Sequence, residues 1–155
     1  MKIWIDADAC PKSVKNILYK TAMSRKVEIF FVANSWLFIP TSDYIHFILV
    51  DQGPDIADNK ITEDCCDGDL VITADVPLAA RIVAKGAIGL DPRGRIYNKN
   101  NIGAISDIRN FMHNLRNDGI VTVGPNSYSN RDSGKFANEL DKVLVKNNLK
   151  KINYD

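Results

Sequence analysis

Five aspartates stand where an active site could use them, after apolar runs or at the start of a predicted helix: Asp6, Asp8, Asp55, Asp58 and Asp75. The first two follow the apolar residues 3–5, and the last follows the apolar residues 70–73. The middle pair comes after a Gly53-Pro54 break, three residues apart and so on neighbouring positions of one helix face. Carboxylates that converge repel one another, so such a cluster either has raised pKa values or binds a cation.

Oxygen ligands of this kind select the hard cations Mg²⁺ or Mn²⁺. We expect Asp6, Asp58 and Asp75 to be metal ligands, with Asp8 and Asp55 as outer ligands or a general base. Ions held there would activate water and neutralise the leaving oxygen of a phosphodiester. The first hypothesis is therefore a Mg²⁺- or Mn²⁺-dependent phosphodiesterase, a nuclease acting on RNA or another nucleic acid.

Several of these aspartates also suit a purely structural role. Asp8, Asp55 and Asp75 each precede a predicted helix, where Asp is a favoured N-cap. Asp6 is harder to explain in this way, because a carboxylate that ends a buried strand is costly without a basic partner, and the nearby sequence offers none. Asp69 precedes its strand, so we predict a turn residue away from the site.

Two other functions compete with the nuclease. In an aspartyl-phosphate phosphatase, Asp6 would be the nucleophile and Asp8 the acid and base, while Thr73 and Lys85 would bind phosphate. That mechanism requires a further acidic pair after the lysine, and residues 86–90 contain none. In the other alternative the chain is a non-catalytic module that binds nucleic acid or protein, and its acids can be neutralised without loss.

Basic residues gather in the stretch that follows Asp75: Arg81, Lys85, Arg93, Arg95 and Lys99. We predict that the first four, together with Thr73, contact substrate phosphates, although a solvated basic surface is the structural alternative. Three aromatic residues are candidates for stacking on bases or for the core: Trp36, Phe38 and Tyr97. Cys10, just before a helix, is either a thiol of lowered pKa or a small buried hydrophobe.

The elements that must position these residues alternate between strand and helix. Strands are predicted at residues 3–5, 27–33, 45–50, 70–73 and 87–90. Helices are predicted from Pro11 onward and at residues 55–64, 77–85, 102–116 and 135–148, with a long exposed loop over residues 119–133. This order favours an α/β fold with a mostly parallel sheet and helices on both faces, in which ligands bind beyond the carboxyl ends of the strands.

Composition limits the class of protein. A chain of 155 residues that is 45% hydrophobic is long enough for one well-buried core, so we predict one domain over residues 1–155. The net charge is +1, yet residues 1–78 carry 7 basic and 12 acidic side chains while residues 79–155 carry 13 and 7. Three cysteines and the lack of a long apolar run predict a cytoplasmic protein with free thiols and no membrane partner.

Longer segments resemble the bacterial YaiI/YqxD family over nearly the whole chain. The similarity rests on residues 5–11 (IDADACP), 32–34 (VAN), 55–58 (DIAD), 68–79 (GDLVITADVPLA), 92–94 (PRG), 109–112 (RNFM) and 136–141 (FANELD). The family is uncharacterised, and the resemblance extends more distantly to PIN-like nucleases. It implies a three-layer PIN-like fold with acidic residues for Mg²⁺ or Mn²⁺ at the carboxyl edge of the sheet.

On that pattern, the resemblance matches Asp6 to the first-strand acid, Asp75 to the acid of a Thr-x-Asp turn, and Asp55 or Asp58 to the acid on the intervening helix. Two positions depart from the family. Val123 stands where the family usually has Gly, and Ser133 replaces an Arg that commonly follows the preceding Asp. These departures weigh against a catalytic role for residues 119–133.

Overall fold

The computed structural model describes residues 1–154, with side chains through residue 152. The strands are β1 (Ile3–Asp6), β2 (Ile29–Ala33), β3 (Ile45–Leu49), β4 (Leu70–Ile72), β5 (Ile88–Leu90) and β6 (Ile96–Tyr97). The helices are α1 (Lys12–Arg25), α2 (Ile56–Asp64), α3 (Val76–Ala84), α4 (Ile102–Asn117) and α5 (Asn130–Tyr154). None of the described helices is long and apolar enough to cross a membrane.

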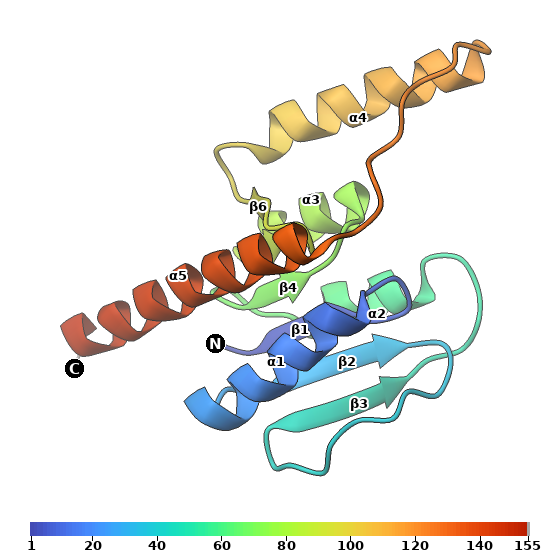
Figure 1. The fold of residues 1–155 in the computed structure, drawn as a ribbon. Coiled ribbons are helices and arrows are strands. Elements are labelled where there is room, and N and C mark those ends of the chain that lie inside the picture. The colour runs from blue at the N-terminus through green and yellow to red at the C-terminus, as the bar shows by residue number, and fades with distance from the viewer. Residues whose placement is uncertain (155) are drawn as a thin grey trace.

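The six strands form one sheet in the order β3-β2-β1-β4-β5-β6 (Figure 1). The first five are parallel, and β6 pairs antiparallel with β5 at one border of the sheet. β1 lies at the centre, between β2 and β4. Because the chain leaves β1 and β4 at the same edge, residues that follow these two strands meet there.

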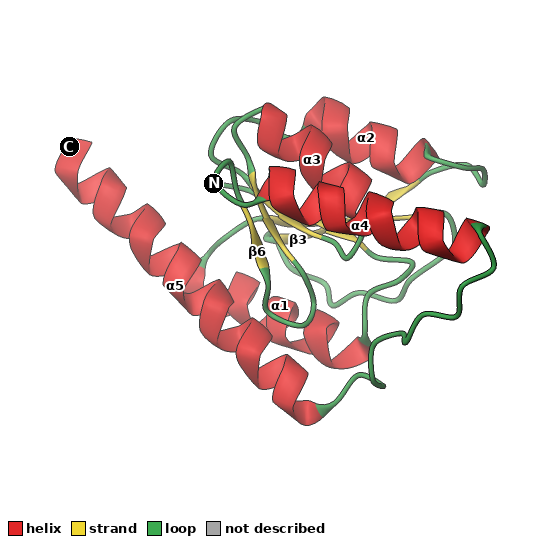
Figure 2. Cartoon of the chain, turned by 90° about the horizontal axis from the view of Figure 1, so that it is seen from above, coloured by secondary structure: helices red, strands yellow, loops and turns green. Residues whose placement is uncertain are grey.

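Side chains alternate between the two faces of the sheet and build one core on each side. Ile3 and Ile5 face α1 and α5, whose buried residues include Leu18 and Phe136. Trp4, between them, faces the opposite side with α2, α3 and the start of α4. Figure 2 shows the resulting three layers. The predicted fold class is thus confirmed, and the arrangement is consistent with a PIN-like fold.

The main differences from the prediction are one additional strand and a longer last helix, while the other elements differ by one or two residues at their ends. β6 was not among the predicted strands; it has only two residues and forms a hairpin with β5 through the turn at Gly94, whose φ is +96°. Helix α5 begins at Asn130, not at residue 135, so the exposed loop ends at residue 129. The Ser129 N–H donates to the Asp132 carboxylate at 3.0 Å, which is the return bond of a capping box.

The opposite, amino edge of the sheet is fixed by Asp69. This side chain was predicted to be a turn residue, and the Asp69 N–H does donate to the Cys66 carbonyl across a turn. Its carboxylate, however, is buried and accepts hydrogen bonds from Lys2 N, Trp4 Nε1 and Cys66 N at 3.0, 3.1 and 2.9 Å. Asp69 therefore joins the start of β1 to the turn before β4.

Candidate functional site

The carboxyl edge of the sheet brings Asp6 and Asp75 together through Thr73. Because β1 and β4 are neighbours with Ile5 opposite Ile72, the residues after them share this edge. The buried Thr73 hydroxyl donates to Asp6 Oδ2 at 3.1 Å and accepts the Asp75 N–H at 3.0 Å. This confirms the expectation that Asp6 and Asp75 lie on one edge. Because the Thr73 hydroxyl bonds both Asp6 and Asp75, the structure gives Thr73 a positioning role, and its contact with substrate stays a prediction.

Asp75 has two roles at once. It is the N-cap of α3, where Oδ1 accepts the Leu78 N–H at 2.9 Å, and Pro77 occupies the first turn, so the predicted capping function is confirmed. No described donor bonds to the other carboxylate oxygen. The negative charge of Asp75 raises the pKa values of Asp6 and Asp58. The side chain is therefore held by the helix while one oxygen remains available to a ligand.

Asp58 faces the same cluster from the first turn of α2. Burial, followed by the charges of Asp75, Asp6 and Asp55, raises the pKa of Asp58 to about 6, while Arg81 lowers it. For Asp6, burial is again the largest cause of a raised pKa, with additions from Asp75 and Asp8, and the Thr73 hydrogen bond opposes the rise. These carboxylates come from separate elements and are close enough to repel one another.

The remaining two aspartates lie at the exposed rim of this cluster. Asp8 Oδ2 accepts the Asn34 N–H at 3.0 Å, which ties the loop after β1 to the end of β2. It does not cap α1, whose N-cap is Pro11. Asp55 occupies the N-cap position of α2 in a left-handed conformation, φ 64°, but its side chain makes no capping bond. The capping interpretation was thus wrong for Asp8. Asp55 does occupy the N-cap position of α2, but its side chain does not cap the helix.

The carboxylates of the cluster are the ligand type that hard cations prefer, but they are not gathered into a complete metal site. Among the described residues, no group of three or more His, Cys, Asp or Glu is gathered closely enough to hold an ion. Mg²⁺, however, keeps several waters and is usually held by one or two carboxylates together with substrate phosphates. Asp6 and Asp75, linked through Thr73, meet that smaller requirement.

Arg81 and Lys85, which were predicted on one face of α3, contact different parts of the molecule. Arg81 lies near enough to the cluster for its charge to lower the pKa of Asp58. Lys85 lies at the other end of the helix, where Nζ donates to the carbonyls of Thr62 and Glu63 at 2.5 and 3.2 Å. Since α3 runs from the carboxyl edge back to the amino edge, its last residue cannot share the site of its first. The structure thus places Lys85 away from the carboxylate cluster, and its phosphate contact stays a prediction.

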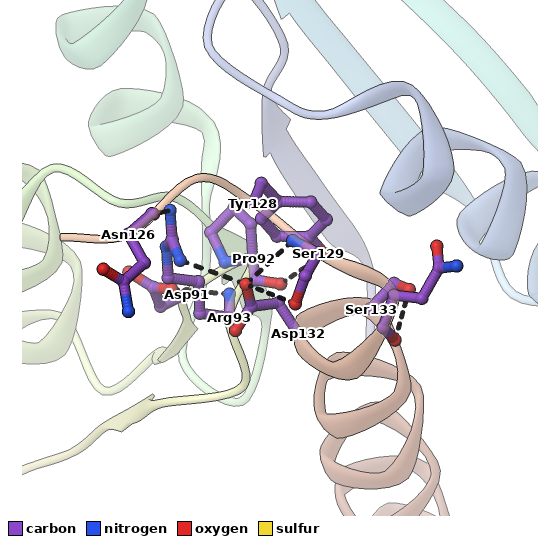
Figure 3. Close-up of polar contacts among 9 residues, drawn as sticks. Asp91, Pro92, Arg93, Asn126, Tyr128, Ser129, Asp132 and Ser133 are labelled. Atoms are coloured by element: carbon purple, nitrogen blue, oxygen red, sulfur yellow. Dashed lines mark hydrogen bonds and ion pairs between the residues drawn. The ribbon is translucent and has the colours of Figure 1, made fainter.

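Arg93 does lie at the carboxyl edge, but it is held in a network of protein contacts. Nη1 pairs with Asp132 at 3.0 Å and Nη2 donates to the Asn126 carbonyl at 2.6 Å (Figure 3). The Tyr128 ring packs against the guanidinium, and its hydroxyl donates to the Pro92 carbonyl at 2.8 Å. This link, which no local sequence signal predicted, fastens the β5–β6 turn to the start of α5. These contacts hold the Arg93 guanidinium in place and use two of its five N–H donors.

Arg95 contacts one of the three aromatic candidates, Tyr97, which is buried, whereas the other two are exposed. The Arg95 guanidinium covers the Tyr97 ring and donates to its hydroxyl at 3.0 Å. Tyr97 is fully buried in the core, so its suggested stacking role is wrong. Trp36 and Phe38, by contrast, are 82% and 101% exposed, in the loop that begins next to Asp8's partner Asn34.

The cysteines are free thiols, as predicted. Burial raises the pKa of Cys10 to about 12, and Lys15 only partly opposes the rise. A thiol of that pKa is almost entirely protonated near neutral pH and is a poor nucleophile. Cys10 is therefore the small buried hydrophobe of the two interpretations.

Comparison with known proteins gives one consistent result. A family model described as "Uncharacterized BCR, YaiI/YqxD family" matches residues 4–146. Proteins named UPF0178 protein are 54% identical in Maridesulfovibrio salexigens, over 94% of this chain and 97% of the relative, and 52% identical in Proteus mirabilis, over 97% and 100%. A relative in Klebsiella pneumoniae is 48% identical over 94% of this chain and 95% of its own length. No solved structure matches the chain.

Proposed function

This chain belongs to the YaiI/YqxD family, and we propose that it is a phosphodiesterase that depends on Mg²⁺ or Mn²⁺ and cleaves RNA or another nucleic acid. One observation carries the proposal. The carboxylates of Asp6, Asp58 and Asp75, from different elements, converge at one edge, where burial and the charge of Asp75 raise the pKa values of Asp6 and Asp58. A fold keeps such mutually repelling groups at a cost, and clusters of this kind are typical of functional sites.

Each residue has a part that follows from its position. Asp6 ends β1, Asp75 caps α3 just after β4 and Asp58 lies on α2, so we assign Asp6 and Asp75 to the cation directly and Asp58 to it through a bound water, because no three described carboxylates are gathered closely enough to hold an ion. The more exposed Asp8 and Asp55 are assigned as outer ligands or as the general base. A bound Mg²⁺ or Mn²⁺ would supply charge neutralisation and an activated water. Thr73 positions Asp6 and Asp75, and Arg81 is left as the basic side chain nearest to Asp58.

The two competing functions have less support than the nuclease. The aspartyl-phosphate phosphatase needs a lysine beside its nucleophile, and Lys85 instead donates to the last carbonyls of α2. A non-catalytic module has no need of a carboxylate whose pKa is raised by burial and by neighbouring carboxylates, so it leaves the energetic cost of ionising Asp58 unexplained. The three free thiols suit a reducing compartment, and we propose the cytoplasm as the site of this activity.

Binding of Mn²⁺ to wild type and to Asp6→Asn, measured by calorimetry and by the thermal midpoint, tests the proposal. A cation that binds only the folded chain raises the midpoint, so wild type should shift and Asp6→Asn should not. Asp107→Asn is the matched control, because Asp107 is an exposed carboxylate on α4 outside the cluster. The thermal midpoint of Asp107→Asn should rise with Mn²⁺ as that of wild type does. Wild type and Asp107→Asn should also cleave an oligouridine, and Asp6→Asn should not.

A second variant separates the cation from the fold. Asp75→Ser keeps an N-cap oxygen but removes the carboxylate, so α3 should stay capped while the Mn²⁺ shift and cleavage are lost. If wild type shows neither a Mn²⁺-dependent midpoint nor a cleavage activity that Asp6→Asn abolishes, the nuclease is excluded and the non-catalytic module is preferred.

A further inference from the structure

A groove of about 800 Å³ lies at the amino edge of the sheet, away from the carboxylate cluster. One wall is the C-terminal half of α5, and the other is the border formed by β5 and β6. We call it the α5 groove and define it by six of its lining residues: Ile88, Ile96, Asn98, Lys142, Lys146 and Lys150. Both views show the end of α5 extending beyond the rest of the molecule (Figures 1 and 2).

The charge of the α5 groove is positive after its ion pairs are counted. Lys142 pairs with Glu139 at 3.1 Å, whereas Lys146 and Lys150 have no carboxylate within 4.0 Å among residues 1–152. Two carboxylates also line the groove. Asp141 is ion-paired with Arg25, so Asp67 is the one left to oppose the lysines.

A second, smaller groove of about 270 Å³ lies on the other side of α5, and it is also basic. Its cationic lining residues are Lys2, Arg25, Lys26 and Lys151, and its acidic one is Glu28. Met1 and Asn147 line both grooves, so the two are neighbours. Basic residues from both ends of the chain thus line the two grooves on either side of the C-terminal half of α5.

We propose that the α5 groove binds nucleic acid through its phosphates. Lys142, Lys146 and Lys150 follow one another at four-residue spacing, which places the three lysines on one helix face at a rise of about 6 Å from one to the next. Together with the Asn98 amide, this row offers the Lys and amide contacts that fix a nucleic-acid backbone without reading its sequence. The inference deepens the proposed function, on which it rests for the identity of the polyanion.

The position of the groove suits a substrate that also reaches the carboxylates. β5 has three residues, so the amino and carboxyl edges of the sheet are only about 10 Å apart along this strand. Arg95 and Lys135 lie at the carboxyl end of the same border, where Gly94 packs against Lys135. A chain of several nucleotides bound to α5 can therefore extend to the other edge.

Fluorescence anisotropy of labelled oligouridine, titrated between about 50 and 200 mM salt, tests the groove. Lys146→Glu/Lys150→Glu should weaken binding at least tenfold and reduce the slope of log affinity against log salt by about 1.4, since each lost phosphate contact accounts for about 0.7 on a single strand. Lys20→Glu/Arg109→Glu changes the net charge equally on exposed parts of α1 and α4, and it should bind within threefold of wild type.

The readouts separate this inference from the proposed function. The groove variant should keep the wild-type Mn²⁺ midpoint shift, which also shows that it is folded, and Lys146→Gln/Lys150→Gln should give an intermediate affinity. Equal losses in the groove and control variants overturn the groove, whatever the cleavage assay shows. So does binding of polyglutamate or of phosphatidylglycerol vesicles as tight as that of oligouridine. A groove effect in a protein that never cleaves leaves this inference standing and removes the nuclease.

Discussion

The Thr73 hydroxyl donates a 3.1 Å hydrogen bond to the Asp6 carboxylate across the two central strands. The same oxygen accepts the Asp75 N–H at 3.0 Å, so one buried side chain orients the two proposed direct ligands. The bond to Asp6 stabilises the ionised form and opposes the rise that burial causes in its pKa.

Thr73→Val is the direct test of this link. Removing the hydroxyl raises the pKa of Asp6 further and leaves the Asp75 N–H without its acceptor, which should cost about 1–3 kcal/mol of folding free energy. Carbon-detected NMR titration of the Asp6 carboxyl and chemical denaturation measure the two effects. Thr73→Ser retains the hydroxyl and should restore the wild-type pKa. An unchanged titration in Thr73→Val would show that the bond does not act on Asp6.

The raised pKa of Asp58 predicts a pH dependence of stability. The group is at its ordinary 3.8 in the unfolded chain and near 6 in the folded chain. The folded state therefore binds the proton more tightly, and the cost of ionising Asp58 is absent below about pH 4 and complete above about pH 6. Asp58→Asn should remove this cost and stabilise the metal-free protein at pH 7.

The shift alone corresponds to about 3 kcal/mol, but Asp58 is half-exposed and its charges are screened, so we expect about 1 kcal/mol. Urea denaturation of wild type and Asp58→Asn between pH 4 and 7 should show curves that diverge as the pH rises. Asp107→Asn serves as the control and should run parallel to wild type. Parallel curves for Asp58→Asn would mean that the cluster does not raise this pKa.

Asp69 should be a stability residue without a part in binding. Asp69→Ala leaves the N–H groups of Lys2, Trp4 and Cys66 without their acceptor, which predicts a loss of about 3 kcal/mol. The exposed neighbour Asp67→Ala should change stability by less than about 0.5 kcal/mol. Denaturant midpoints compare them directly. A small loss for Asp69→Ala would show that water replaces the carboxylate.

The ion pair between Arg93 and Asp132 is predicted to fasten the loop before α5. A double-mutant cycle with Arg93→Ala and Asp132→Ala should give a coupling energy of about 1 kcal/mol, because the pair is partly shielded and supported by further hydrogen bonds. Proteolysis within residues 119–129 should become faster in each single variant. If the single effects add and the loop stays protected, the pair is a surface contact without consequence.

The local sequence pattern was enough to place the carboxylate edge. Asp6 and Asp75 each come directly after an apolar run, and in a parallel sheet every such run ends at the same edge. The helix that places Asp58 begins near a Gly-Pro break, and Pro77 marks the first turn of the helix that Asp75 caps. These signals are short-range, so they are readable along the chain, and the family resemblance pointed to the same residues.

Tertiary structure decided what the remaining polar groups do. Lys85 was assigned to the site through its neighbour Arg81, but it lies at the C-terminal end of α3, where its ammonium group bonds the carbonyls at the end of α2 instead of reaching the carboxylates. Arg93 and Asp132 meet across 39 positions, and Trp4 and Asp69 across 65. The sequence determined which residues end strands and cap helices, because those are local backbone preferences. Only the packed chain decided which charges remain open to a ligand, because that depends on partners brought together by folding.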